Sequence, residues 1–239
     1  MFKFKQLSIG ALLVVTATYF FVYSAVRYNL AATAALGNYN PITVVIDAGH
    51  GGEDGGAVSI SGIQESDLNL SVALRMEQLL ALCGIHPAMI RREDIAVYTE
   101  GGTITEKKVS DLKQRVDLVN RTDHALLISI HQNHFSEPKY DGAQVFYAPS
   151  TSSQKLAQLT QQQLRTTLNP GNNRQEKPAD SVYLMQKVQC PAILVECGFL
   201  SNPQETELLQ SEVYQIKIVC ALGCALTQYL EEGKWEVEI

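Results

Sequence analysis

Two kinds of hydrophobic pattern alternate along the chain from Pro41 onward. Short apolar runs predict strands, and longer segments with apolar residues three or four positions apart predict helices. The predicted strands are 43–47, 87–90, 125–130, 143–148, 181–185 and 192–195. The predicted helices are 67–83, 110–122, 152–168 and one that runs from Pro203 to about Glu231. Strands interleaved with helices in this way predict an α/β fold of three α/β/α layers, with a six-stranded, mostly parallel sheet covered on both faces.

A separate apolar segment, 7–26, comes before this region and contains twenty residues without a charge. As a helix it would be about 30 Å long, which matches the hydrocarbon core of a membrane. Lys3 and Lys5 precede it, so the positive-inside rule predicts a cytoplasmic N-terminus and an exported domain. The triplet at 32–34 (ATA) resembles a signal-peptidase site. Cleaved signals usually have a shorter apolar stretch, so we favour an uncleaved transmembrane signal anchor over a signal peptide.

Charge is divided unevenly between a leader at 1–40 and the domain that we expect at 41–239. The whole chain has 19 Lys and Arg against 25 Asp and Glu, and the leader holds three of the bases and no acid. The remainder therefore carries 16 basic and 25 acidic residues. An acidic domain lacks the clustered bases that nucleic-acid binding through phosphate contacts requires, so we expect no nucleic-acid partner.

The cysteines are five in number and widely spaced: Cys83, Cys190, Cys197, Cys220 and Cys224. An odd number without a CxxC pair predicts neither a disulfide framework nor a zinc ribbon. We expect them to be small buried side chains, with Cys220 and Cys224 on the core face of the last helix.

Polar side chains follow several predicted strands, at the edge where parallel sheets collect reactive groups. His50 lies in a glycine-rich turn after the first strand, and glycines let a metal or substrate approach the backbone. The turn lacks the GxxxxGK[ST] order of a phosphate-binding loop, and a turn histidine without a role is the alternative. His131 directly follows the strand at 125–130, with His134 close behind. The residues alone leave open which of these two histidines is a ligand.

Two glutamates complete the set of candidates. Glu65 stands where a helix begins, and an acid is favourable there for the helix dipole alone. Glu196 follows the last apolar strand, where an ionised carboxylate is costly unless it meets a metal, a cation or a substrate proton. A structural salt bridge to Arg91, Arg92 or Arg115 is the alternative for Glu196.

Taken together, two imidazoles and one carboxylate make a His₂Glu set with an open position, the arrangement that catalytic zinc prefers. The remaining glutamate is then the base for a zinc-bound water. The sequence contains no HExxH helix, no GxSxG elbow and no recognisable Cys/His nucleophile signature. It therefore favours metal-assisted hydrolysis at one edge of the sheet.

A series of motifs runs through the domain in a fixed order. They are VIDAGHGG at 45–52, Glu65 with Asn69 and Leu70, RRED at 91–94, LKQRV at 112–116 with Asn120, SIHQN at 129–133 and ECGFLSN at 196–202. Together they resemble the zinc-dependent N-acetylmuramoyl-L-alanine amidases, which cut bacterial peptidoglycan. The resemblance extends from about Thr43 to Leu230, so it covers the whole domain. One departure is Ala48, where many members have a proline.

The resemblance implies an α/β amidase domain with one bound Zn²⁺. The implied zinc ligands are His50, Glu65 and His131, which selects His131 over His134. Glu196 falls on the family's catalytic glutamate, and Asn133 marks a region expected to contact substrate. The implied reaction is hydrolysis of the amide that joins the lactyl group of N-acetylmuramic acid to L-alanine of the stem peptide. In it, Glu196 takes the proton of the attacking water and then protonates the leaving amine.

An apolar anchor followed by a single amidase domain also resembles the germination-specific amidases, which act on spore cortex. A vegetative wall amidase is the alternative. The expected partners are peptidoglycan and, through the leader, the membrane, with an extracytoplasmic location. The sequence leaves open whether a protein activator is needed. Two other functions stay open: a catalytically silent wall-binding or activator module, and a zinc peptidase that cuts within the stem peptide.

Overall fold

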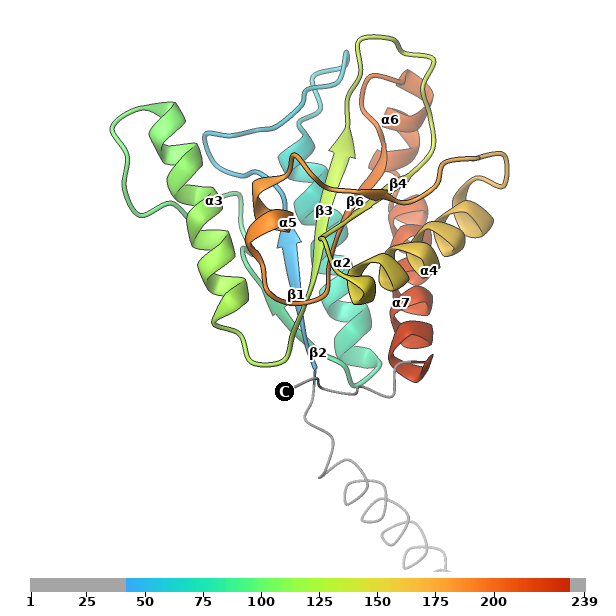
Figure 1. The fold of residues 1–239 in the computed structure, drawn as a ribbon. Helices are drawn as coiled ribbons and strands as arrows, with labels where there is room; N and C mark the ends of the chain where they lie inside the picture. Colours follow the sequence, from blue (N-terminus) through green and yellow to red (C-terminus); the bar gives the residue numbers. More distant parts are fainter. Residues whose placement is uncertain (1–41, 233–239) are drawn as a thin grey trace, which may run out of the picture. The chain divides into compact units, whose positions relative to one another are not determined.

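The computed structural model describes residues 42–232 of the chain (Figure 1). The predicted membrane segment at 7–26 and the rest of the leader lie outside the described residues. The elements, in chain order, are β1 (Thr43–Ala48), α2 (Glu65–Leu82), β2 (His86–Met89), α3 (Ile104–Asn120), β3 (Ala125–Asn133), β4 (Gln144–Tyr147), α4 (Thr151–Leu168), β5 (Lys177–Pro178), α5 (Tyr183–Lys187), β6 (Ala192–Phe199), α6 (Pro203–Gln210) and α7 (Glu212–Glu232).

The six strands form one sheet in the order β2-β1-β3-β6-β4-β5. β1 pairs in parallel with β2 and β3, and β3 pairs in parallel with β6. β4 runs antiparallel to β6, and the short β5 is parallel to β4. The prediction of a six-stranded, mostly parallel sheet is confirmed, with β4 and β5 as its reversed edge.

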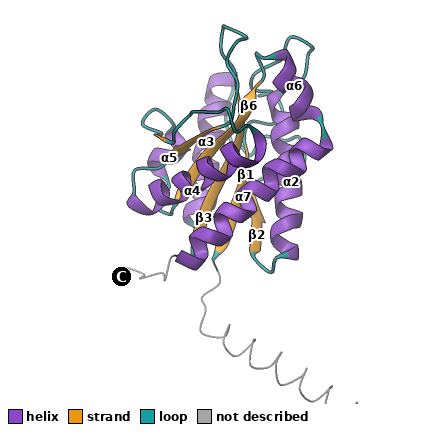
Figure 2. Ribbon diagram, turned by 90° about the vertical axis from the view of Figure 1, so that its right-hand side faces the viewer, coloured by secondary structure: helices purple, strands orange, loops and turns teal. Residues whose placement is uncertain are grey.

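Helices cover both faces of this sheet (Figures 1 and 2). On one face α2, α4 and α7 pack together, and Val44 and Ile46 of β1 belong to their core. On the other face lie α3 and α5, where Val45 and Leu127 share a core with Val116 of α3. Successive residues of a strand point to opposite faces, so a continuously apolar β1 serves both layers. The three-layer α/β/α prediction is confirmed.

The predicted strand at 181–185 is wrong. This segment enters the short helix α5, in which Leu184 and Met185 are buried. The edge strand is instead β5, formed by two residues further towards the N-terminus. A run of five residues can bury two apolar side chains as a helical turn or as a strand, so the hydrophobic pattern could not decide between them.

The single long helix predicted from Pro203 is also wrong, because the structure divides it into α6 and α7. Ser211 between them is extended, with φ −73° and ψ 124°. The side-chain amide of Gln215 donates to the carbonyl of Leu209 at 2.8 Å. That bond satisfies one of the carbonyls that the end of α6 leaves without a helical partner.

Helix α3 begins at Ile104 rather than at residue 110. Its start is fixed by a capping box, in which Thr103 accepts from the Glu106 amide and the Glu106 carboxylate accepts from the Thr103 amide. Such a box satisfies backbone N–H groups that the first turn leaves free. The earlier start places two lysines beside the site described below.

Helix α7 is, within residues 42–232, the one helix that by length and composition could cross a membrane. It packs against α2 and α4, and Leu222 and Leu226 are buried, so it serves as a core helix of the domain. Its Cys220 and Cys224 are exposed, as is Cys83, whereas Cys197 is buried. The expectation of buried cysteines is therefore wrong for these three. The helical register puts Cys220 and Cys224 on the outer side of α7.

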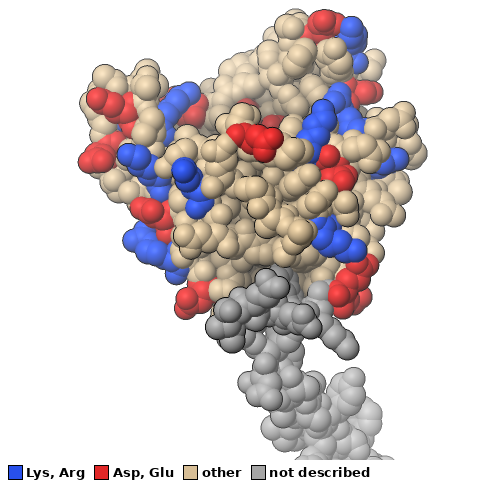
Figure 3. Space-filling view, in the orientation of Figure 1, with Lys and Arg blue, Asp and Glu red and all other residues tan. Residues whose placement is uncertain are grey.

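Charged side chains of both signs are interspersed on the face of the domain drawn in Figure 3. That face has no basic stripe of the kind that phosphate contacts to nucleic acid would need.

Candidate metal centre and active site

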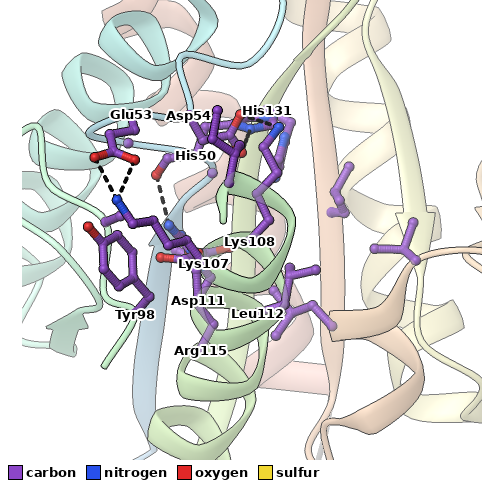
Figure 4. Close-up of a pocket in the computed structure, with 18 of the residues that line it drawn as sticks. His50, Glu53, Asp54, Tyr98, Lys107, Lys108, Asp111, Leu112, Arg115 and His131 are labelled. Atoms are coloured by element: carbon purple, nitrogen blue, oxygen red, sulfur yellow. Dashed lines mark hydrogen bonds and ion pairs between the residues drawn. The ribbon is translucent and has the colours of Figure 1, made fainter. Parts of the chain in front are cut away.

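The three candidate ligands meet at the carboxyl edge of the sheet. His50 follows β1, Glu65 is the first residue of α2, and His131 lies in β3. Their ligand atoms all lie within 4.8 Å of one another. Nε2 of His50 is 3.3 Å from Oε2 of Glu65, and Nδ1 of His131 is 2.9 Å from Oε1. The two imidazole rings are 5.0 Å apart (Figure 4). The pairing of β1 with β3 brings together residues that are far apart in sequence.

Two glycines leave the space that this cluster occupies. A Cβ atom on Gly49 would lie 2.2 Å from Nε2 of His131. A Cβ atom on Gly56 would lie 2.6 Å from Oε2 of Glu65, and the backbone there has a left-handed φ of 69°. A side chain at either position would displace a candidate ligand, so the close approach of ring and carboxylate to the backbone requires glycine.

Each oxygen of the Glu65 carboxylate accepts a backbone hydrogen bond. Oε2 accepts a hydrogen bond from the amide of Ala57 at 2.9 Å, and Oε1 accepts one from the amide of Gln132 at 3.1 Å. Burial alone would raise the pKa of Glu65, but hydrogen bonds and charge from His131 and His50 hold it well below its usual range. The two backbone hydrogen bonds favour the ionised carboxylate, which is the form that binds a metal.

The turn that carries His50 is braced by two buried arginines. Arg91 donates to the carbonyls of Ala48 at 2.8 Å and Gly49 at 3.0 Å. Arg115 donates to the carbonyls of Ala48 at 3.0 Å and His50 at 2.8 Å. The φ of His50 is 60°, an uncommon left-handed conformation for a residue with a side chain, and these bonds hold it there. This bracing role was missed from the sequence, where their place in the family motifs was the only indication.

Glu196 lies beside the cluster, because it pairs in register with His131 across β3 and β6. Its Oε2 atom is buried and has no hydrogen-bond partner among the described residues. Burial raises the pKa of Glu196 to about 7, although the charge of His131 opposes the shift. A carboxyl group with this pKa can both accept and release a proton near neutral pH.

The salt bridge considered as an alternative for Glu196 is not formed, since all three arginines bind other groups. Arg92 pairs with Glu77, and Arg115 pairs with Asp47 and Asp111. Within residues 42–232, the hydrogen bonds of Arg91 go to the backbone carbonyls of Ala48, Gly49, Ser66 and Glu93. The carboxylate of Glu196 therefore faces the candidate metal site without a neutralising guanidinium.

A cavity of about 430 Å³ opens beside these groups, between α3, α5 and the sheet (Figure 4). Glu53, Lys107 and Lys108 give it a charged side, and Leu112, Leu184 and Leu194 give it an apolar side. Its size is within the range of small-ligand sites, so part of a substrate can enter next to His131 and Glu196.

The two remaining candidates lie near the end of β3. His134 is exposed in the loop that follows, and it is not part of the metal-binding group that includes His131. Asn133 is half-buried, and its carbonyl accepts a hydrogen bond from the Leu200 amide at 2.7 Å. It does not line the 430 Å³ cavity, and its contact with substrate stays a prediction.

A protein-family model described as N-acetylmuramoyl-L-alanine amidase matches residues 44–228. The chain belongs to this amidase family. The match includes His50, Glu65, His131 and Glu196. It also includes all six strands except Thr43, the first residue of β1. The family resemblance, the α/β fold and the amidase activity that the sequence predicted are therefore confirmed.

Individual relatives of this amidase agree with the family match. It is 38% identical over 191 residues to the germination-specific N-acetylmuramoyl-L-alanine amidase of Bacillus subtilis (strain 168), covering 79% of this chain and 80% of the relative. The CwlD amidase from Clostridioides difficile, solved in complex with the GerS lipoprotein, aligns with a TM-score of 0.78 and 36% identity. That alignment covers 80% of this chain and 100% of the other. An N-acetylmuramoyl-L-alanine amidase from Clostridium difficile 630 aligns with a TM-score of 0.70 and 29% identity, over 80% and 98% of the two chains.

The amidase acts on peptidoglycan, which lies outside the cytoplasmic membrane. The predicted extracytoplasmic action is therefore supported. The donor set of His50, Glu65 and His131 also suits a divalent metal, because neutral imidazoles and one carboxylate are ordinary zinc ligands.

Proposed function

We propose that this domain hydrolyses the amide between the lactyl group of N-acetylmuramic acid and L-alanine of the stem peptide, with one Zn²⁺ held by His50, Glu65 and His131. The observation that carries the proposal is the pairing of His131 with Glu196 on the wall of a cavity. It puts a carboxyl group whose Oε2 is buried without a hydrogen-bond partner among the described residues next to three candidate metal ligands. A bound Zn²⁺ supplies a Lewis acid that makes water nucleophilic near neutral pH and polarises the amide carbonyl.

The protein's own residues supply the proton transfers in this proposal. Glu196 takes the proton of the attacking water and gives it to the leaving nitrogen, which departs as the amine of L-alanine. Its burial favours the return of the proton, since the charged form is poorly solvated there. Glu65 stays ionised throughout, because its two backbone hydrogen bonds favour the charged carboxylate. Asn133, at the end of β3, is proposed as a contact for the substrate.

The leader and the biological setting are part of the same proposal. We infer that residues 1–40 anchor the domain to the outer side of the membrane, so that it reaches peptidoglycan directly. The similarity to a germination-specific amidase supports a role in spore cortex. The similarity to CwlD, which was solved with the GerS lipoprotein, supports a protein partner for this chain as well.

The test uses the purified full-length chain and peptidoglycan, with release of amino groups as the readout. Activity is expected to disappear with a chelator and to return with Zn²⁺. His131→Ala should abolish it, whereas His134→Ala, which changes an exposed histidine three positions away, should leave it intact. Full activity of His131→Ala, or equal loss in both variants, would refute the ligand assignment. Zinc binding without any released product would favour the silent wall-binding module.

A further inference from the structure

Two adjacent ion pairs connect helix α3 to the turn after His50. Gly51 and Asp54 close this turn with reciprocal backbone hydrogen bonds of 2.8 and 3.2 Å, and both glutamate and aspartate side chains of the turn reach α3. Nζ of Lys107 is 2.8 Å from each carboxylate oxygen of Glu53. Nζ of Lys108 is 2.8 Å from Oδ1 of Asp54. Figure 4 shows the two lysines and the two acids side by side.

The two ion pairs differ in the further contacts that their acidic residues make. The second oxygen of Asp54, Oδ2, is 2.9 Å from Nδ1 of His50. Nε2 of the same imidazole faces Glu65 at 3.3 Å. A continuous row of polar contacts therefore runs from Lys108 through Asp54 and His50 into the candidate metal site. Glu53 pairs with Lys107, whose Nζ also lies over the ring of Tyr98 at 5.2 Å from its centroid, and neither of these contacts leads to a candidate ligand.

A neutral imidazole carries one N–H and one lone pair, and the partner of one nitrogen decides the state of the other. A carboxylate can only accept a hydrogen bond, so Nδ1 of His50 donates to Asp54, and this contact orients the ring with Nε2 towards Glu65. A metal held at the cluster would be bound by Nε2, while Nδ1 keeps its hydrogen bond to Asp54. Outer-shell carboxylates of this kind typically change metal affinity by 10- to 100-fold.

We propose that Asp54 is a positioning residue for the metal site and that Lys108 couples its placement to helix α3. The inference rests on the proposed metal-dependent function and assigns residues beyond the three ligands and Glu196. Arg115, which donates to the carbonyl of His50, is a second link from α3 to the same histidine. Helix α3 thereby holds both the backbone and the side chain of one ligand.

The coupling has a reciprocal consequence. If the Lys108 contact strengthens metal binding, then metal binding strengthens the docking of α3 by the same free energy. Amides in the first half of α3 should therefore exchange hydrogen more slowly in the zinc-loaded protein than in the zinc-free protein. In Lys108→Gln this difference should shrink.

The chain offers matched controls, because Glu53 and Lys107 form the same kind of ion pair one position away. The experiment measures Zn²⁺ affinity of the full-length chain by competition with a chromogenic chelator. Asp54→Asn is expected to bind Zn²⁺ about 10- to 100-fold more weakly, and Glu53→Gln to bind it as the parent does. Lys108→Gln acts through a half-exposed pair, so we expect a smaller loss of about two- to five-fold.

Lys107→Gln should leave Zn²⁺ affinity unchanged. Lys108→Arg should bind Zn²⁺ as the parent does, unlike Lys108→Gln, because arginine keeps the positive charge next to Asp54. Equal affinities in Asp54→Asn and Glu53→Gln would overturn the proposal. Equal effects of the two lysine variants would overturn it as well. The side chains of Lys107 and Lys108 are 25% and 52% exposed, so we expect these variants to fold even if Asp54→Asn does not. Failure here leaves the proposed amidase mechanism standing, whereas a parent chain that cleaves peptidoglycan without binding Zn²⁺ would refute that mechanism itself.

Discussion

Replacing Arg115 by methionine removes the positive partner of a carboxylate buried in the domain. The side chain of Arg115 is 3% exposed and that of Asp47 is 1% exposed, and the two form an ion pair between α3 and β1. Asp47 also accepts a hydrogen bond from the hydroxyl of Ser129 at 2.6 Å. The methionine variant keeps most of the side-chain volume but leaves an uncompensated charge three residues before His50.

The expected loss can be estimated from this burial. Removing one partner of a buried ion pair costs about 3–5 kcal/mol of unfolding free energy, since the remaining charge is neither paired nor hydrated. Arg92→Met is the control, because Arg92 is 64% exposed and pairs with Glu77 at the surface. Surface pairs of that kind contribute roughly 0–1 kcal/mol. Asp47→Asn added to Arg115→Met should recover part of the loss, because it removes the orphaned charge.

The loss should also depend on pH. Burial alone would raise the pKa of Asp47, but Arg115 and Ser129 hold it below its ordinary value of 3.8. In the native chain the pair stabilises the fold above that value, and the contribution is lost as pH falls through the lower folded-state pKa. In Arg115→Met the guanidinium no longer opposes the effect of burial, so we expect the folded-state pKa of Asp47 to rise above its ordinary value and the variant to lose stability as pH rises. The difference between variant and parent should therefore be larger at pH 7 than at pH 4.

The assay is urea unfolding of the full-length chain, followed by circular dichroism at both pH values. A difference below about 1 kcal/mol at pH 7 would refute the reasoning, as would equal differences at the two pH values. Additive effects of Arg115→Met and Asp47→Asn would show that the two side chains do not act as a pair.

Further substitutions test other parts of the structure. Gly49→Ala should fold but lose Zn²⁺ binding, measured by chelator competition, because its methyl group would meet the His131 ring at 2.2 Å; unchanged affinity would contradict this crowding. Thr103→Ala should cost about 0.5–2 kcal/mol in urea unfolding through loss of the α3 cap, and a change within 0.3 kcal/mol would argue against the cap. Glu196→Gln should keep Zn²⁺ affinity and lower kcat by about 10²- to 10⁴-fold, the range for a proton-transfer group; equal kcat would remove Glu196 from the chemistry.

The sequence singled out candidate site residues that the structure brings together, but it did not predict the contacts around them. His50 follows β1, whereas His131 and Glu196 lie near the carboxyl ends of β3 and β6, within strands that were predicted to end one residue before each of them. All three could be placed together because parallel strands share one carboxyl edge. Glu65 could not be separated from an ordinary helix-starting acid until α2 was seen to place it between the two imidazoles. The helix start and the candidate metal ligand are the same residue, so the local sequence alone could not separate the two roles.

The roles of Arg91 and Arg115 depend on contacts that only the folded chain creates. Each guanidinium donates to a carbonyl at the end of β1 and to one in the turn that follows, from more than forty positions away in sequence. No periodicity or composition predicts such a pairing. The break at Ser211 was missed for a related reason, because it contains neither glycine nor proline and depends on the Gln215 amide reaching Leu209.

The most direct test of the central claim is mass spectrometry of the products that the zinc-loaded full-length chain releases from purified peptidoglycan. The account predicts stem peptides with a free amino group on L-alanine and glycan with a free lactyl carboxylate. It also predicts no such products from Glu196→Gln on the same time scale. Cleavage between amino acids of the stem peptide, with the lactyl-alanine bond intact, would contradict the assigned bond. Product release by Glu196→Gln at the parental rate would contradict the role of Glu196 in proton transfer.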